Sequence, residues 1–391
     1  MGKKQKAVIT AGCFGGYFLF GFIDNMKGTT LPAILEDMGF DHSTAGMIIC
    51  SEYTGFFLAT FLAGLLADLF GKKATLVLAG FCLILGVAGY ASSFHLFLFV
   101  GFIFLIGLGL GALELGGSNV LSGLWGGRSG RYLNLLNACY GLGAIVTPVV
   151  AGHWLGLGIS WRAVYRYSLF LILPITLYFI IMKVPREEKK DGRRERVDGK
   201  ELLAIILHKK VLFMYVVIFA YVAAEIGTAT WFVEFLQKEK QMPASVSSVC
   251  FSIYFVGMTV GRLLGSLFVD RVGHRRSLLI FTGISSLSLA VGIFGSGYVS
   301  FALIFTGFGF SIIFPTSTTV VSGIPSKNSG ILLGSFFAFG GLGGMVGPYL
   351  IGVVNDFLGL KAGMAVNLVF CGMIAVALWM RVRDKKDMEV S

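Results

Sequence analysis

Four ionisable side chains lie near the middle of segments that are otherwise apolar. Asp24 and Lys27 occur in the first such segment, Glu114 in the fourth and Glu225 in the seventh, and Glu52 lies near the outer end of the second. Charges at membrane depth are costly, and they mark solute paths, proton relays or paired charges. Burial also disfavours the ionised form of a carboxyl group, so a poised carboxyl can load and release a proton. Asp24, Glu114 and Glu225 are therefore candidate proton-coupling residues.

The spacing of these residues leaves alternatives open. Asp24 and Lys27 are three positions apart, so they share one helix face and can pair. Such a pair is either a structural contact that holds the helix in register or a coupling site. Glu114 has no basic residue in its own segment. It is either paired with Lys27 from another helix or protonated for part of a cycle.

Polar and aromatic side chains in the same segments could bind a small polar solute. Binding sites for such solutes combine apolar and aromatic surfaces with a few convergent polar groups. Packing is the simpler explanation for any single aromatic residue, because the chain contains 36 Phe. The candidates for solute binding are Asn25, Lys27, Glu114, Asn119, Asn137, Tyr140, Tyr221, Glu225, Trp231 and Tyr254.

The composition is that of an integral membrane protein. Of the 391 residues, 55% are hydrophobic and 14% are charged, whereas soluble domains carry about 25% charged residues. A bilayer core is spanned by roughly 20 apolar residues in a helix. The expected transmembrane helices are 7–36, 43–69, 73–92, 96–124, 130–156, 161–184, 209–237, 244–270, 275–296, 298–324, 329–357 and 361–381.

A short polar motif occurs twice, each time after the second apolar segment of one half of the chain. Asp68 is followed three residues later by Gly71 and two lysines, and Asp270 is followed three residues later by Gly273 and basic residues. A duplicated motif indicates a duplicated bundle. The expected fold is an all-α membrane protein with twelve transmembrane helices in two pseudo-symmetric six-helix bundles. The bundles are residues 1–184 and 209–391, joined by the hydrophilic linker 185–208.

The distribution of basic residues indicates how the chain crosses the membrane and does not indicate a nucleic-acid partner. The formal net charge is +11, and most Lys and Arg fall in the termini and in alternate loops. This is the positive-inside pattern, which places both termini in the cytoplasm and the chain in the cell (inner) membrane. The six Cys have no metal-ligand spacing. No nucleophile–base set indicates an enzyme, and the only expected cofactor is a coupling ion, proton or sodium.

The helix count, the two halves and the doubled motif together resemble the major facilitator superfamily. The resemblance implies that the first, fourth, seventh and tenth helices line a cavity that opens alternately to the two sides. It also implies that the doubled motif clasps neighbouring helix ends and controls gating. The corresponding residues are Gly64, Asp68, Gly71, Lys72, Lys73, Arg262, Gly265, Asp270, Arg271 and Gly273.

The stretches around Glu114, Tyr140 and Glu225 are similar to those of the fucose–galactose–glucose proton symporter family. That resemblance implies a role for Glu114 in sugar recognition and proton coupling. The family's amide in the fifth helix aligns with Tyr140, and Asn137 lies one turn earlier. Its aspartate in the first helix aligns with Gly28, whereas this chain has Asp24 and Lys27 nearby.

These observations predict a secondary transporter that works by alternating access. The favoured function is proton-coupled import of a sugar or related small polar solute by a monomer in the lipid bilayer. One alternative is a proton-coupled efflux antiporter of drugs or metabolites. The other is an organic-anion carrier in which Lys27 binds the solute.

Overall fold

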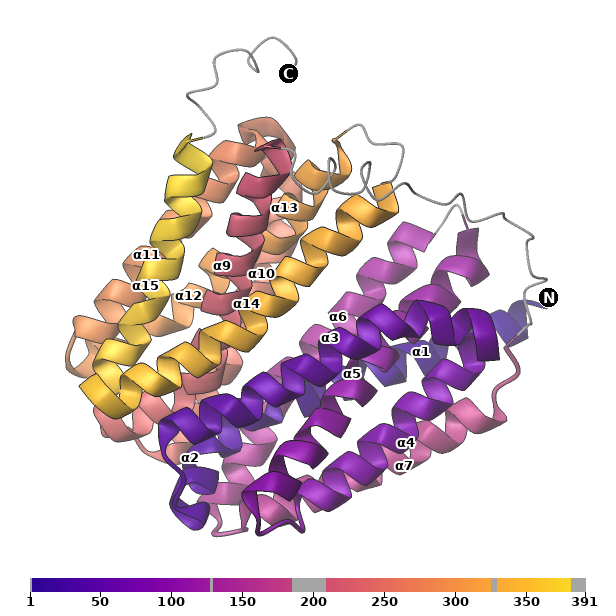
Figure 1. Ribbon diagram of the computed structural model, residues 1–391, viewed down its shortest axis with the longest axis horizontal. Helices are drawn as coiled ribbons and strands as arrows, with labels where there is room; N and C mark the ends of the chain where they lie inside the picture. The colour runs from indigo at the N-terminus through magenta and orange to yellow at the C-terminus, as the bar shows by residue number, and fades with distance from the viewer. Residues whose placement is uncertain (1, 127–128, 185–208, 325–328, 381–391) are drawn as a thin grey trace. The chain divides into compact units, whose positions relative to one another are not determined.

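The computed structural model describes residues 2–126, 129–184, 209–324 and 329–380, which form helices joined by short turns (Figure 1). Within these residues, 11 helical segments are long and apolar enough to cross a membrane. The prediction of an all-α membrane protein is therefore confirmed. The linker 185–208 and the tail after residue 380 lie outside the described residues.

The packing of the chain divides it into two units. The first is Met1–Lys189 with Ala229–Ser252, and the second is Lys190–Thr228 with Ile253–Ser391. The end of the seventh expected helix and the start of the eighth thus pack with the first unit. The division at residues 184 and 209 remains a prediction from the sequence.

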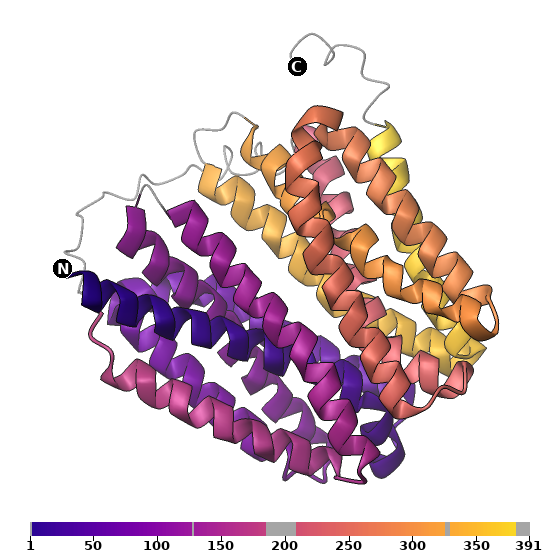
Figure 2. The same cartoon turned by 180° about the vertical axis from the view of Figure 1, so that it is seen from behind.

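The helices from α1 to α7 all belong to the first unit. In the first unit, α3 and α4 both pack on α5, and α1 packs along α6 (Figure 2). The first-unit helices are α1 (Lys3–Asp24), α2 (Met26–Met38), α3 (His42–Phe70), α4 (Lys72–Tyr90), α5 (Leu96–Trp125), α6 (Ser129–Gly156) and α7 (Trp161–Ile181). The remaining elements are α9 (Lys209–Glu234), η2 (Phe235–Glu239), α10 (Ala244–Val272), α11 (His274–Phe294), η3 (Gly297–Ile304), α12 (Phe305–Phe310), α13 (Ile313–Ser322), α14 (Ser329–Leu358) and α15 (Leu360–Met380).

Two of the expected helices are interrupted, which corrects the prediction of continuous segments. The segment 7–36 breaks at Asn25, between α1 and α2. The segment 298–324 begins as the 3₁₀ turn η3 and breaks between α12 and α13. At the second break, Pro315 has no backbone N–H to donate to the carbonyl of Ser311. At the first, the Asn25 side chain competes with the backbone for a helix carbonyl.

The break at Asn25 is stabilised by hydrogen bonds to the end of α1. The last carbonyls of a helix have no partner within that helix. The amide Nδ2 of Asn25 donates to the carbonyl of Gly21 at 2.8 Å, and its backbone N–H donates to Ile23. The buried hydroxyl of Thr147 on α6 donates to the carbonyl of Phe22 at 2.9 Å. The chain can therefore turn at this point without leaving buried carbonyls unsatisfied.

The two copies of the doubled motif share one backbone conformation. Gly71 precedes α4 with φ 88° and ψ 154°, and Gly273 precedes α11 with φ 90° and ψ 139°. Residues with a side chain are essentially excluded from this region. The motif needs glycine here because the chain must reverse between two antiparallel helices.

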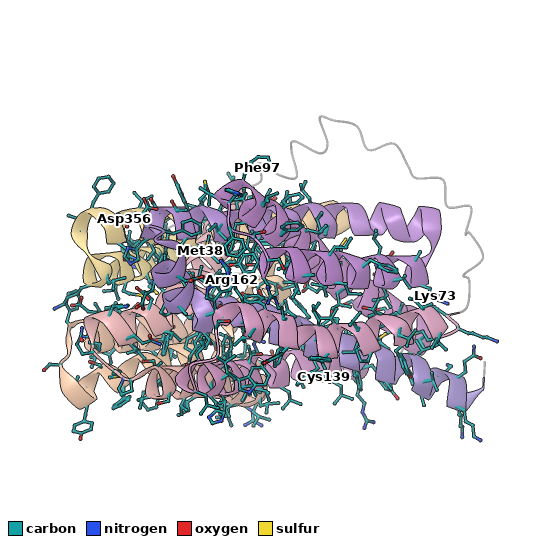
Figure 3. The ribbon with its side chains drawn as sticks, turned by 90° about the horizontal axis from the view of Figure 1, so that it is seen from below. Met38, Lys73, Phe97, Cys139, Arg162 and Asp356 are labelled. Atoms are coloured by element: carbon teal, nitrogen blue, oxygen red, sulfur yellow. The ribbon has the colours of Figure 1, made fainter. Side chains whose placement is uncertain are left out.

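A basic residue two positions after each glycine binds the end of the last helix in its half. Lys73 Nζ donates to the carbonyl of Ile180 at 2.6 Å, and Arg275 Nε donates to the carbonyl of Leu378 at 2.9 Å. Lys73 therefore lies at the end of α7 opposite to Arg162, as Figure 3 shows. Positive charge at a helix C-terminus is favourable because of the helix dipole.

Close contact between α1 and α6 depends on glycine in both helices. A Cβ atom added to Gly143 would overlap the carbonyl oxygen of Phe18, and one added to Gly21 would overlap that of Tyr140. The same kind of contact recurs in the second unit, where Gly343 meets the carbonyl of Phe219. Small residues that let backbones approach are typical of membrane helix packing.

Replacing Gly143 by alanine is expected to lower the free energy of unfolding by about 1–3 kcal/mol, because α1 and α6 must separate. Thermal unfolding of the purified full chain would measure this. The control is Gly101→Ala, since no atom lies within 4 Å of a Cβ at that helical position. Equal melting temperatures for the two variants would contradict the close-contact interpretation.

Candidate functional site

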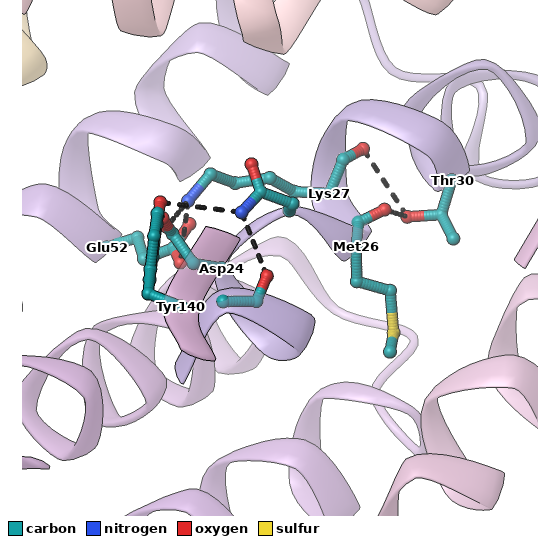
Figure 4. Close-up of polar contacts among 8 residues, drawn as sticks. Asp24, Met26, Lys27, Thr30, Glu52 and Tyr140 are labelled. Atoms are coloured by element: carbon teal, nitrogen blue, oxygen red, sulfur yellow. Dashed lines mark hydrogen bonds and ion pairs between the residues drawn. The ribbon is translucent and has the colours of Figure 1, made fainter. Parts of the chain in front are cut away.

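A buried charged triad lies at the break between α1 and α2. The ammonium of Lys27 is 2.6 Å from Asp24 Oδ1 and 3.0 Å from Glu52 Oε1 of α3 (Figure 4). The side chains of Lys27, Asp24 and Glu52 are 9%, 13% and 4% exposed. The ion pair thus joins the end of α1 to the start of α2 across the break, and α3 adds a second carboxylate.

Hydroxyl and aromatic groups complete the surroundings of the triad. The hydroxyl of Tyr140 on α6 donates to Asp24 Oδ2 at 2.8 Å. The amide of Asn25 donates to the same hydroxyl at 3.4 Å, and the ring of Tyr53 lies 4.7 Å from the ammonium of Lys27. Both oxygens of Asp24 are therefore engaged, one by a cation and one by a hydroxyl.

The pairing that the sequence predicted between Asp24 and Lys27 is present, and Glu52 adds a second carboxylate. The sequence marks Glu52 as an ionisable group inside the second apolar segment but does not assign it to solute binding or proton coupling. Its pairing with Lys27 depends on how α3 packs beside α2, which sequence spacing does not show. In the described part of the chain, no cluster of three or more His, Cys, Asp or Glu could hold a metal ion.

Glu114 lies in the same unit but is held differently. Glu114 is half-buried on α5. Asp24 is near enough to interact with the Glu114 carboxylate electrostatically. The hydroxyl of Tyr17 on α1 donates to the backbone carbonyl of Glu114 at 2.6 Å and contacts the hydroxyl of Ser118 at 2.5 Å. Among the described residues no hydrogen bond or ion pair engages the carboxylate of Glu114, which leaves it available for a solute or a proton.

A second polar centre lies in the second unit, at the break between α12 and α13. Arg262 of α10 is 4.0 Å from the carboxylate of Glu225 on α9. Its Nε donates to the carbonyl of Ser311 at 3.4 Å. That carbonyl is the one that Pro315 leaves without a backbone donor. Each unit therefore has a broken helix with an ion pair beside the break.

The sequence assigned Arg262 to the gating motif, and that role stays a prediction. The described contacts of its guanidinium are with Glu225 of α9 and with the Ser311 carbonyl at the break after α12. Asp270 of the motif lies 3.7 Å from His274. Gly64 and Asp68 belong to a part of α3 whose side chains are not described.

Three further candidates are Asn137, Asn119 and Trp231. Asn137 is exposed, and its amide donates to the carbonyl of Leu133 on its own helix. Asn119 is half-buried on α5. Trp231 is fully buried in the first unit, with its ring 5.5 Å from that of His42.

The two tyrosines of the second unit are fully buried among aromatic residues. The ring of Tyr221 lies 5.9 Å from that of Phe310, and the ring of Tyr254 lies 5.1 Å from that of Phe255. Both tyrosines are also close enough to Glu225 and Arg262 to interact with them electrostatically, so they lie near the second polar centre. Solute binding by either tyrosine stays a prediction.

Replacing Arg262 by lysine is expected to lower the free energy of unfolding by about 1–3 kcal/mol, because the Ser311 carbonyl loses its donor. A lysine cannot reproduce the fork of donors that reaches two groups at once. Thermal unfolding of the purified chain is the measurement, with the exposed Arg276→Lys as the control. Equal stability of the two variants would show that Arg262 does not hold the break.

Comparison with known proteins agrees with this architecture. The sequence model of the Major Facilitator Superfamily matches residues 13–249 and 214–391. The "Putative glucose/galactose transporter" of Helicobacter pylori (strain J99 / ATCC 700824) is 27% identical over 375 residues, covering 88% of each chain. The "Bypass of stop codon protein 6" of Saccharomyces cerevisiae is 25% identical over 395 residues, covering 89% of this chain and 77% of that protein.

Solved structures show the same fold. A single-residue mutant of the nucleoside transporter NupG has a TM-score of 0.79 at 17% identity, covering 97% of this chain and 99% of its own. A single-residue variant of the Escherichia coli fucose:proton symporter FucP has a TM-score of 0.66 at 21% identity, covering 96% of this chain and 99% of its own. These likenesses concern transporters, not enzymes, and they confirm the predicted fold. With family matches that extend over nearly its whole length, the chain belongs to the Major Facilitator Superfamily.

Proposed function

We propose that this transporter is a proton-coupled importer of a sugar or related small neutral polar solute. The observation that carries the proposal is the buried triad of Asp24, Lys27 and Glu52 at a helix break in the first unit. Solute and coupling-ion sites of secondary transporters typically form at interrupted helices. The hydroxyl of Tyr140 and the amide of Asn25 add neutral polar groups beside the charges.

Two groups in the first unit have separate roles in this proposal. The Glu114 carboxyl accepts hydrogen bonds from hydroxyl groups of the solute and carries the coupling proton. It has no charged partner among the described residues. Asp24 is held by Lys27 and Tyr140 at 2.6 and 2.8 Å, so it is a fixed acceptor. Tyr17 orients the backbone of Glu114 through its 2.6 Å hydrogen bond.

The state of Lys27 favours a neutral solute over an organic anion. Its ammonium already contacts two carboxylates and is 9% exposed. An anionic solute would have to displace one of these carboxylates and would bring a further negative charge into a buried site. The relative from Helicobacter pylori that is named for glucose and galactose, and the likeness to a fucose:proton symporter, also support the sugar class.

The proposed cycle moves the two six-helix halves against each other. Within it, Glu225 and Arg262 form the second unit's polar contact with the solute or proton. The motif glycines Gly71 and Gly273 keep the cytoplasmic turns tight while their basic neighbours hold helix ends. The protein is placed in the cell (inner) membrane as a monomer with both termini in the cytoplasm, in keeping with the distribution of basic residues.

Counterflow in proteoliposomes would test the solute class. Vesicles loaded with one unlabelled solute are diluted into a labelled one, using hexoses and deoxyhexoses in one panel and organic acids in the other. At least one neutral sugar is expected to drive counterflow and to accumulate faster with an acidic exterior. Counterflow with the organic acids alone would refute the sugar proposal.

A further inference from the structure

The position between Asp24 and Glu52 has the properties of a cation site. Two carboxylate oxygens converge on one point, at 2.6 and 3.0 Å from the Lys27 nitrogen that occupies it. The face of the Tyr53 ring lies 4.7 Å from the same nitrogen and favours a positive charge. All three charged side chains are at most 13% exposed. Water therefore contributes little to the solvation of a cation at this point.

A second observation concerns the free oxygen of Glu52. Its Oε2 is buried and has no hydrogen-bond partner in the described part of the chain, and the residue is 3% exposed. A buried carboxylate oxygen without a partner is costly. A small cation that replaced the long lysine side chain could reach this oxygen as well as the two already engaged. The site thus has an unused ligand that the lysine does not contact.

The other ionisable groups around Glu52 do not compete for this position. Tyr90 of α4 and Tyr165 of α7 are close enough to interact with it electrostatically. Asp24 of α1 and Lys27 of α2 are the remaining charged groups. On α5, which packs on α3, the residue facing the Glu52 backbone is Gly107. Lys27 is therefore the sole counter-charge among the described groups that face Glu52.

We propose that Asp24 and Glu52 form a binding site for a monovalent cation such as Na⁺, and that Lys27 fills it as a tethered ammonium. The covalent tether makes the cation permanent, so the native protein needs no sodium. Calcium requires six or more oxygen ligands and magnesium gives up its water reluctantly. A site of two carboxylates beside the face of one aromatic ring in a dry setting therefore favours a monovalent ion. Glu52 acts here as a positioning residue for Lys27.

The proposed cation site rests on the proposed transport function only in the experiment that measures uptake. Binding of sodium to the purified protein can be measured without a transported solute. If the solute proves not to be a sugar, the cation site is unaffected. If sodium binds the native protein, sugar counterflow is unaffected. The two proposals therefore fail in different experiments.

The first test compares the purified full-length wild type with Lys27→Gln in detergent at about pH 8, where fewer protons compete for the carboxylates than at neutral pH. Melting temperatures are recorded in NaCl and in choline chloride at equal ionic strength. The wild type is expected to show no difference between the salts. The variant is expected to melt roughly 2–4 °C higher in NaCl, because a ligand that binds only the folded state stabilises it.

The control variant removes one of the two carboxylate ligands of the site. Lys27→Gln combined with Glu52→Gln keeps the Asp24 carboxylate but loses the second ligand, and its sodium response is expected to disappear. A sodium response that persists in this double variant would overturn the assignment of Glu52. The melting temperature of Lys27→Gln is also recorded in CaCl₂ and MgCl₂. If it is no higher in NaCl than in choline chloride, the cation site itself is overturned.

If Lys27→Gln does not fold, a measurement on the wild type still tests the cation site. In proteoliposomes, uptake driven by a pH gradient is expected to be the same with Na⁺ or choline outside. An increase of twofold or more with Na⁺ would show that sodium reaches the site in the native chain. That result would overturn the role of Lys27 as a tethered cation, whatever the solute.

Discussion

Replacing Glu114 by glutamine is expected to abolish accumulation of the solute driven by a pH gradient, while counterflow remains measurable. The amide keeps the shape of the side chain but cannot take up a proton. A gradient of one pH unit stores about 1.4 kcal/mol per proton. One coupled proton can therefore sustain roughly tenfold accumulation, which the variant should reduce to the external concentration.

Glu114 differs from Asp24 and Glu52 in having no ion-pair partner among the described residues. Asp24 and Glu52 both contact the ammonium of Lys27, so protonating either of them would break an existing buried contact. Glu114 has no such contact among the described residues, and its nearest charged influence is Asp24. A proton on Glu114 relieves repulsion between two carboxylates without disrupting an ion pair. The proton is therefore expected to bind Glu114 first.

The experiment separates coupling from solute binding. Accumulation in proteoliposomes with an acidic exterior is measured beside counterflow without a gradient, and the exposed Glu239→Gln serves as the control. Loss of both activities in Glu114→Gln would assign the residue to solute binding alone. Full accumulation by the variant would remove Glu114 from the coupling role.

Much of the fold could be predicted because hydropathy and charge placement act locally. Helix ends such as those of α4 and α11 follow from a glycine in a conformation that other residues avoid. The breaks at Asn25 and Ser311 were not predicted. Each depends on a competing donor or a missing N–H within a segment that is apolar overall. A hydropathy value averaged over a whole segment does not change noticeably because of one such residue.

The candidate site was predictable only within one helix. The pairing of Asp24 with Lys27 follows from helical spacing. The contact of Lys27 with Glu52, and that of Arg262 with Glu225, each joins residues more than 20 positions apart. Such contacts depend on which helix faces neighbour each other, and sequence periodicity leaves that open. Arg262 shows the consequence, because its place in the sequence suggested the gating motif, whereas its described contacts are with Glu225 and the Ser311 carbonyl.

Replacing Lys27 by methionine is expected to lower the free energy of unfolding by about 3–5 kcal/mol in sodium-free buffer. Methionine fills a similar volume, so the effect is chiefly electrostatic. Removing one partner of a buried ion pair leaves an uncompensated buried charge, and that is its main cost. Here two carboxylates, at 13% and 4% exposure, would face each other with no cation between them.

Adding Glu52→Gln to the Lys27→Met background should recover part of this loss, because it removes one of the two repelling charges. Glu52→Gln alone should cost less than Lys27→Met, since the 2.6 Å pair of Lys27 with Asp24 remains neutral overall. A double-mutant cycle on thermal unfolding isolates this interaction, with the exposed Lys4→Met as a control expected within about 0.5 kcal/mol of wild type. Strictly additive effects would mean that Lys27 and Glu52 do not share a charge balance. The triad would then be an Asp24–Lys27 pair with an independent neighbour.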